Sequence, residues 1–243
     1  MEKGQIMFVP CQYREPNGSW ITDLIRRNPL ALLVSSGDAA REPHATHLPV
    51  IKDPNGEDVS REDLSGSLLF GHMNVQNPHW AALEDGCPVL LVFTGPHAYV
   101  SPTTYGTHPA APTWNFTSVH VHGAVQKVDS REETLDIVRS TVHTLEKEFG
   151  AGWDMTHSVG YFRRILPGVG AFRVRVTSVE GMFKLSQEQD SAVRDRVRRD
   201  FAGSTCTLRR DTAHLMDRLP DERPSVTTDP ADDPRVREID ARP

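Results

Sequence analysis

Histidine is the residue type whose number and placement point most directly to chemistry in this chain. There are eleven histidines, and eight of them lie between His44 and His122, counting both ends. His72 ends an expected strand, and His79 follows Asn77-Pro78, a pair typical of a helix start. A neutral imidazole aimed by a rigid helix could bind iron. Because buried histidines more often make only ordinary hydrogen bonds, both interpretations stay open.

A second pair of histidines lies on the expected strand Phe116–Val128, where His120 and His122 share one face. Two imidazoles so placed could bind zinc. No cysteine or histidine partners with familiar zinc spacing accompany them, so the pattern gives zinc little support.

Three segments carry side chains suited to a flat, anionic molecule. In Pro112–Ser118, a Trp and a Phe beside small hydroxyl residues could form one wall for a planar ring, or simply lead a loop into a core strand. Arg163 and Arg164 could hold carboxylates or phosphates, although such pairs often face solvent. The segment Met182–Gln187 could close over an anionic group. The candidate binding residues in the first and third segments are Thr113, Trp114, Asn115, Ser118, Lys184, Ser186 and Gln187.

Composition and missing motifs exclude several classes of protein. The net charge of −6 argues against a dominant nucleic-acid surface. There is no nucleotide-binding glycine motif and no nucleophile elbow. Three cysteines without a CxxC pair favour a reducing compartment. With neither a signal peptide nor a long apolar run, we expect a cytoplasmic protein that contacts no membrane.

Several helices and many short strands are expected from periodicity and from turn residues. The expected helices are Trp20–Arg27 capped by Ser19, one opening at Asn77-Pro78, 130–149, Asp154–Ile165, Gln189–Phe201 and Cys206–Leu219. The expected strands are Leu30–Ser35, His44–Ile51, Ser67–His72, Val89–Phe93, Ala98–Val100, Phe116–Val128 and Ala171–Val179. We expect a turn at Gly37–Arg41, a turn between strands at Thr94–His97 and a long loop at Ser101–Pro112.

This order of elements predicts a mainly β protein of the α+β class, a closed or split β-barrel with peripheral helices. We expect residues 1–220 to form a single domain with helical additions. Residues 221–243 are polar and rich in Pro and Asp, which predicts a disordered tail.

Several motifs in one order resemble the PaiB family of FMN-binding negative transcriptional regulators. They are Ala45-Thr-His-Leu-Pro49, Gly71-His-Met-Asn74, Asn77-Pro-His-Trp80, Gly95-Pro-His-Ala-Tyr-Val-Ser-Pro102, Pro112-Thr-Trp-Asn115, Val119-His-Val-His-Gly123 and Lys184-Leu-Ser-Gln187. The resemblance covers about residues 7–201 and implies an FMN-binding-type split barrel.

A narrower resemblance is to piperazate synthases, the haem-dependent relatives of PaiB. It rests on Gly71–Asn74 with Asn77–Trp80, together with Ala110–Ser118, Gly150–Met155, Tyr161–Phe172 and Gly181–Gln189. It implies an enzyme that binds haem b rather than FMN, forms a homodimer and cyclises L-N5-hydroxyornithine to L-piperazic acid through an N–N bond. The alternatives are an FMN-binding regulator and a flavin-dependent oxidoreductase.

The resemblance also implies roles for individual residues. His79 is the first choice as iron ligand, because ordinary PaiB relatives carry a residue such as Gln there; His72 is the second. Arg163 or Arg164 would hold the substrate carboxylate or a haem propionate. Lys184, Ser186 and Gln187 would line the anionic edge of the pocket. The wall of the pocket would be formed by Thr113, Trp114, Asn115 and Ser118.

Overall fold

The computed structural model describes residues 6–36, 42–56 and 64–219. The expected turn at Gly37–Arg41 and the expected tail at 221–243 lie outside these residues.

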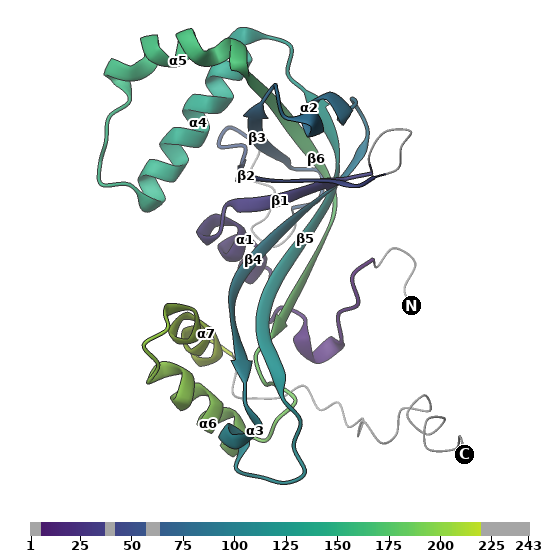
Figure 1. Ribbon diagram of the computed structural model, residues 1–243, viewed down its shortest axis with the longest axis vertical. Coiled ribbons are helices and arrows are strands. Elements are labelled where there is room, and N and C mark those ends of the chain that lie inside the picture. The colour runs from purple at the N-terminus through teal and green to yellow at the C-terminus, as the bar shows by residue number, and fades with distance from the viewer. Residues whose placement is uncertain (1–5, 37–41, 57–63, 220–243) are drawn as a thin grey trace, which may run out of the picture.

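Six antiparallel strands close into a barrel in the order β1-β2-β3-β6-β5-β4 (Figure 1). The strands are β1 (Leu30–Ser35), β2 (His44–Lys52), β3 (Leu68–Asn74), β4 (Pro88–Val100), β5 (Thr113–Lys127) and β6 (Val169–Lys184). Closure gives every strand of the ring a paired neighbour on both sides along part of its length. The expected barrel with added helices is therefore confirmed.

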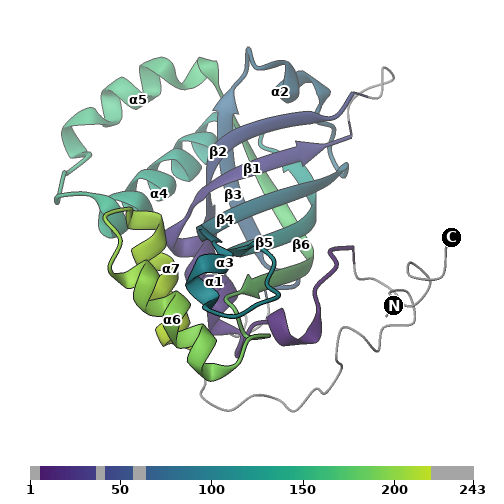
Figure 2. The ribbon, with the colours of Figure 1, turned by 60° about the horizontal axis from the view of Figure 1, so that its bottom comes forward.

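The α-helices of the described residues lie mostly outside the barrel (Figure 2). They are α1 (Ser19–Arg27), α2 (Pro78–Ala82), α3 (Pro102–Tyr105), α4 (Arg131–Phe149), α5 (Val159–Ile165), α6 (Ser191–Ala202) and α7 (Thr207–Asp217). Short 3-10 turns lie at Cys11–Tyr13, Thr156–Ser158 and Leu166–Gly168. No helix in the described part of the chain is both long enough and apolar enough to cross a membrane.

The expected turn at Thr94–His97 is wrong, because β4 runs on through these residues as one strand. Its pairing with β5 shifts register between Thr94 and His97, which makes a bulge rather than a chain reversal. Gly95 permits the bulge, since a Cβ there would lie 2.4 Å from Oγ1 of Thr117. The expected loop at Ser101–Pro112 likewise contains the short helix α3.

Alternating side chains fill the barrel from β4, β5 and β6. Leu91, Val119 and Val121 are fully buried and belong to the main apolar core. Helix α1 adds Trp20 and Leu24 to that core, and the Trp20 ring meets the Phe183 ring edge to face at 5.3 Å. The strand periodicity expected for β5 therefore matches its burial.

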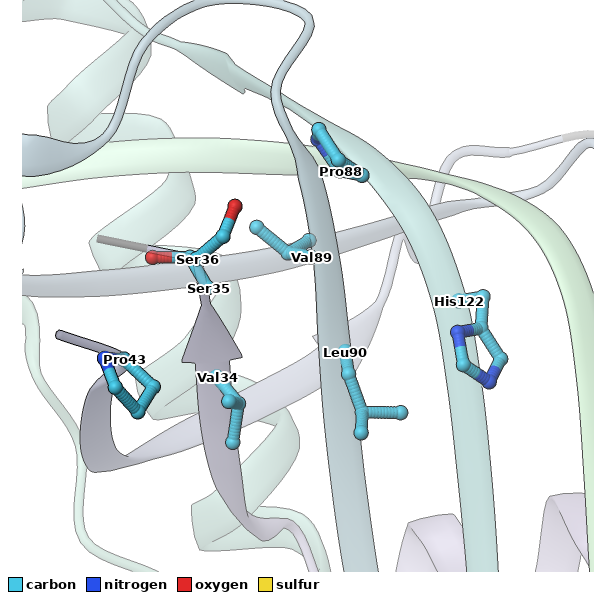
Figure 3. Close-up of a pocket in the computed structure, with 8 residues that line it drawn as sticks. All are labelled: Val34, Ser35, Ser36, Pro43, Pro88, Val89, Leu90 and His122. Carbon is cyan, nitrogen blue, oxygen red and sulfur yellow. The ribbon is translucent and has the colours of Figure 1, made fainter. Parts of the chain in front are cut away.

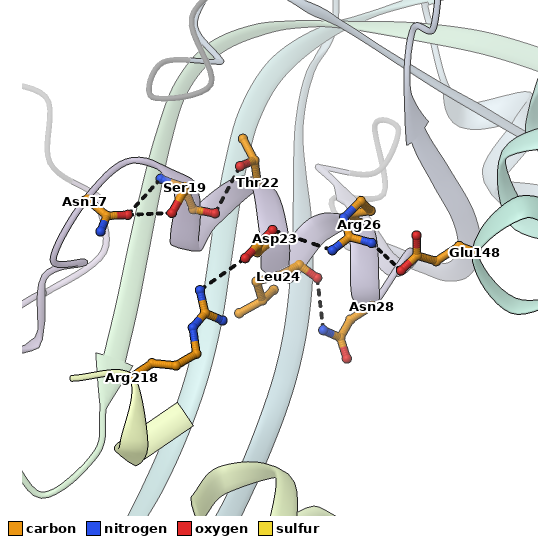
Figure 4. Close-up of polar contacts among 9 residues, drawn as sticks. All are labelled: Asn17, Ser19, Thr22, Asp23, Leu24, Arg26, Asn28, Glu148 and Arg218. Carbon is orange, nitrogen blue, oxygen red and sulfur yellow. Dashed lines mark hydrogen bonds and ion pairs between the residues drawn. The ribbon is translucent and has the colours of Figure 1, made fainter. Parts of the chain in front are cut away.

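Polar contacts tie α1 to two distant helices (Figure 4). Arg26 donates to the Glu148 carboxylate on α4, and Arg218, just after α7, donates to Asp23 at 3.1 Å. Ser19 is not the expected cap, because Asn17 Oδ1 accepts from the Ser19 backbone N–H at 3.3 Å. An Asx-type bond from two residues earlier starts this helix instead.

Helix α4 covers the outer face of β2, β3 and β6 through a second apolar cluster. That cluster consists of Ile51, Phe70, Val128, Ile137 and Ala171. Within α4, Thr141 is buried, whereas Phe149 at its C-terminal end is 56 % exposed. Helix α5 begins at Val159, later than expected, after a 3-10 turn at Thr156–Ser158.

Candidate functional site

His79 lies at the barrel rim and is only 2 % exposed. Its Nε2 is 3.0 Å from Oγ of Ser35 at the end of β1. Its Nδ1 is 2.9 Å from Oγ1 of Thr46 on β2. The His44 ring stacks on the imidazole, with centroids 5.3 Å apart and an interplanar angle of 22°. Both ring nitrogens therefore have hydroxyl partners, and one ring face is covered.

The start of α2 fixes the position of His79, as the Asn-Pro pair predicts. Asn77 Oδ1 accepts from the His79 backbone N–H at 3.0 Å, and Pro78 occupies the first helical turn. Burial lowers the pKa of His79, and the neighbouring His44 lowers it further. The imidazole is thus held neutral, the form that can accept a proton or bind a metal.

His72 lies on β3, where its neighbours Gly71 and Met73 are buried. Its Nδ1 is buried without a hydrogen-bond partner among the described residues. Burial also lowers the pKa of its imidazole. An unsatisfied buried nitrogen is costly, and such an atom is a candidate for an unseen ligand.

A shallow hollow of about 270 Å³ opens beside the rim, on the outer side of β1, β4 and β5 (Figure 3). Val34, Leu90 and His122 line it, and Ser35 belongs to its lining as well. Typical ligand pockets are larger, about 300–1,000 Å³. The hollow of one chain is therefore small for a flat cofactor.

Aromatic rings gather at the far end of β4 and β5. Trp114 is 51 % exposed, and its ring centroid is 5.9 Å from those of both Tyr99 and His97. All three side chains face away from the core, because Ala98 and Val100 take the inner positions. Trp114 therefore lies exposed beside two further rings, and its role as a pocket wall stays a prediction.

Several expected pocket residues are instead bound to one another. Asn115 and Ser186 are both completely buried and hydrogen-bond each other at 2.9 and 3.1 Å. Gln187 Oε1 accepts from the Leu185 N–H at 2.6 Å. Lys184 Nζ donates to Thr113 Oγ1 at 2.5 Å. Lys184, Ser186 and Gln187 were predicted to line the edge of the pocket that faces an anionic group. Lys184 supplies a positive charge there, whereas the side chains of Ser186 and Gln187 are bound within the protein.

A carboxylate on β6 joins the middle of β5 to the N-terminal segment. Glu180 accepts from the backbone N–H groups of Ile6 and Met7, both at 3.0 Å. His122 Nε2 lies 3.6 Å from the same carboxylate. The pKa of His120 is lowered by burial and by His122, and Glu180 opposes that shift. Sequence reasoning did not single out Glu180.

Arg163 and Arg164 are exposed on α5, which buries none of its side chains. The Arg164 guanidinium lies 5.0 Å from the Tyr161 ring centroid. Ser118 is 9 % exposed and lies on β5 between Thr94 and Met182. Among the described residues, neither arginine forms a hydrogen bond or ion pair with another expected site residue.

Within one chain, the rim around His79 lies far from the aromatic wall around Trp114. Ser35 pairs with Val89, and Val89 pairs with Gly123, so the rim lies level with Gly123 on β5. Trp114 lies nine residues earlier on that strand, about 30 Å away at the usual rise. The rim residues Ser35, His44 and Thr46 were missed by sequence reasoning, although the match at Ala45–Pro49 already included Thr46.

No group of three or more His, Cys, Asp or Glu side chains that could hold a metal ion occurs within residues 6–36, 42–56 and 64–219. A zinc site at His120 and His122 therefore gains no third ligand from this part of the chain.

Comparison with known proteins places these features in context. The model of a family described as "Putative FMN-binding domain" matches residues 7–178. The Bacillus subtilis "Protease synthase and sporulation protein PAI 2" is 27 % identical over 186 residues, 76 % of this chain and 84 % of that protein. An uncharacterized protein of Emericella nidulans is 28 % identical over 224 residues, 79 % of this chain and 88 % of its own length.

Two solved structures share the fold. The FAD and heme binding protein from Mycobacterium smegmatis superposes with a TM-score of 0.53 at 13 % identity, covering 93 % of this chain and 97 % of that one. The flavocytochrome Anf3 from Azotobacter vinelandii gives 0.50 at 11 % identity, covering 74 % of each chain. At these identities the likeness establishes the fold alone.

Proposed function

This chain belongs to the family described as "Putative FMN-binding domain", with a PaiB-like relative, and we propose that within it the protein is a haem-dependent piperazate synthase. The reaction would convert L-N5-hydroxyornithine to L-piperazic acid with loss of one water. The observation that carries the proposal is the buried, neutral His79 at the rim, within the motif Asn77–Trp80 that resembles these synthases.

The histidines fit a haem iron in different ways. His72 has a buried Nδ1 with no partner among the described residues, so iron or another donor could satisfy it. His79 is better aimed by its helix, but one of its hydroxyl partners, Ser35 or Thr46, must release a ring nitrogen first. His79 remains our first choice as the residue that would bind the iron, and His72 is our second. The names of the two proteins that share the fold mention haem and flavin, which supports a fold compatible with either cofactor.

Haem b would supply a Lewis acid that weakens the N–O bond of the substrate hydroxylamine. The protein must bring the α-amine to the distal nitrogen, so that the N–N bond forms as the N–O bond breaks and the oxygen leaves as water. Folding a flexible chain into that geometry lowers the entropic part of the barrier. Arg163 or Arg164 would fix the substrate carboxylate, while Trp114 with Thr113, Asn115 and Ser118 would form or support the wall.

A second copy of the chain would complete the site. The rim and the aromatic wall of one chain lie about 30 Å apart on β5, and the hollow beside the rim holds only about 270 Å³. The outer face of β1, β4 and β5 carries half-buried apolar side chains such as Val34, Leu90 and Val92. Such a face suits a self-complementary interface between two copies. We therefore propose a homodimer in which the rim of one copy meets the wall of the other.

The main alternative is an FMN-binding regulator or a flavin-dependent oxidoreductase, as the family description implies. The two cofactors are distinguished by the spectra of the purified protein, since haem gives a Soret band, whereas flavin gives a yellow colour and fluoresces. A folded, active preparation that contains only flavin would rule out the haem proposal.

The reaction is tested by incubating the haem-loaded protein with L-N5-hydroxyornithine. Mass spectrometry should show a product lighter by one water, with a ring visible by NMR. His79→Ala should lose the Soret band and turnover, whereas His143→Gln, at an exposed position on α4, should keep both. If His79→Ala and His72→Ala both retain full haem and activity, neither histidine is the ligand.

A further inference from the structure

We infer that Ser35 is a removable cap on Nε2 of His79, and that Thr46, oriented by Asn77, is the positioning residue that holds the ring whether or not Nε2 is occupied. The identity of the group that replaces the cap, a haem iron, rests on the proposed function. The hydrogen-bond relay itself does not.

The direction of the relay follows from the Asn77 amide. Its oxygen accepts from the His79 backbone N–H at 3.0 Å, so its nitrogen is the atom that faces Thr46, 3.3 Å from Oγ1. Thr46 Oγ1 thus accepts from Asn77 and has a hydroxyl proton to give to Nδ1 of His79, 2.9 Å away. A neutral imidazole then carries its proton on Nε2, which donates to Ser35 Oγ at 3.0 Å.

Hydroxyl groups make this arrangement reversible. If a metal takes the lone pair of Nε2, the single ring proton of His79 must lie on Nδ1. Thr46 Oγ1 can then accept two hydrogen bonds, one from Nδ1–H of His79 and one from the Asn77 amide, because a hydroxyl oxygen has two lone pairs. The ring keeps its place through the change, since Thr46 contacts it in both states and the His44 ring covers one face.

The location of Ser35 makes it the partner that gives way. Ser35 ends β1 and is among the residues that line the hollow, although its hydroxyl is on the inner face with His79, whereas Thr46 does not line the hollow. A ligand that enters from the hollow therefore meets Ser35 before it meets the rest of the relay. Ser36 lines the same hollow but is not one of the two hydroxyl partners of the His79 ring, which makes it a matched control.

Two measurements test the relay and the cap separately. In the haem-free protein, 15N NMR of the His79 ring should show the Nε2–H tautomer in the wild type. Thr46→Val should change that tautomer ratio, and Thr46→Ser should restore it. In hemin titrations, Ser35→Ala should tighten binding about five- to tenfold, since one hydrogen bond no longer competes. Thr46→Val should weaken it about tenfold or more, and Ser36→Ala should leave it unchanged.

The inference is overturned if the wild-type ring carries its proton on Nδ1, or if Ser35→Ala binds hemin no more tightly than Ser36→Ala. Unchanged hemin binding by His79→Ala would instead overturn the ligand assignment, and with it the cap role, while the NMR result would still decide the relay. Circular dichroism of each variant shows that a change in affinity does not come from unfolding.

Discussion

Asn115 and Ser186 hydrogen-bond each other inside the end of the barrel where β5 begins, although they lie 71 residues apart in the chain. The Asn115 amide nitrogen also lies 3.8 Å from Sδ of Met216 on α7. This buried pair joins the start of β5 to the turn after β6 and to the C-terminal helices. Asn115 and Ser186 were expected to line a binding pocket, but in this position their side chains bond to each other and stabilise the fold.

Asn115→Ala should destabilise the protein by about 1–3 kcal/mol, because the Ser186 hydroxyl would be left buried without its partner. Urea unfolding followed by circular dichroism measures the loss. Gln126→Ala is the matched control, since it removes an exposed amide from the same strand. A loss no larger than that of the control would show that the pair contributes little to stability.

Ser186 should tolerate glycine better than alanine. Its φ of 64° lies in the left-handed region, which costs a residue with a Cβ about 1–2 kcal/mol. Both substitutions remove the hydroxyl, but only Ser186→Gly also relieves the backbone. We expect the glycine variant to unfold at a higher urea concentration than Ser186→Ala. Equal midpoints would mean that the turn is not strained.

The sequence was sufficient for the barrel and for most helix starts. Alternation along 116–124 predicted the two faces of β5, and Asn77 caps its helix as expected. The turn predicted at Thr94–His97 failed because Gly and Pro also occur in bulges, and only the pairing with β5 distinguishes a bulge from a reversal. The turn preferences of single residues carry no information about how β4 pairs with β5.

The candidate site was predicted in pieces rather than as a whole. His79 was singled out from the helix start at Asn77-Pro78, and Trp114 from the aromatic and hydroxyl residues of Pro112–Ser118. Ser35 and Thr46 were missed, since a lone hydroxyl on a strand carries no signal until the register of β1 with β2 places it beside His79. Contacts of this kind depend on the closed barrel, not on spacing along the chain.

Acidification should destabilise the fold as the pH falls below about 6.5, the ordinary histidine value. Burial lowers the pKa of His72, His79 and His120 in the folded protein. The unfolded chain then binds more protons than the folded one in this range, so stability is full above the unfolded pKa and decreases toward the lowered folded pKa. Urea midpoints measured between pH 8 and pH 5.5 should show this decrease.

The histidine origin of that pH dependence is checked with a substitution. His79→Gln should flatten the decrease, while His157→Gln, which replaces an exposed histidine on a 3-10 turn, should not. An unchanged slope in His79→Gln would assign the effect to the other two buried histidines or to carboxylates.

Gly170→Ala should disturb the rim through Trp80. A Cβ at Gly170 would lie 2.5 Å from Cε2 of the Trp80 indole, closer than real contacts allow. Trp80 directly follows His79 on α2, and Lys127 holds the outer face of its ring at 4.6 Å. The ring must therefore shift and take α2 with it, at a cost of about 1–3 kcal/mol for overpacking.

Tryptophan fluorescence and hemin affinity should both change in Gly170→Ala. Gly168→Ala is the control, because a Cβ at Gly168 meets nothing within 4 Å. If Gly170→Ala loses stability yet keeps wild-type hemin affinity, the indole moves without displacing His79, and the helix is held by the Asn77 cap alone. A loss of both would show that the packing of Trp80 on Gly170 positions the imidazole.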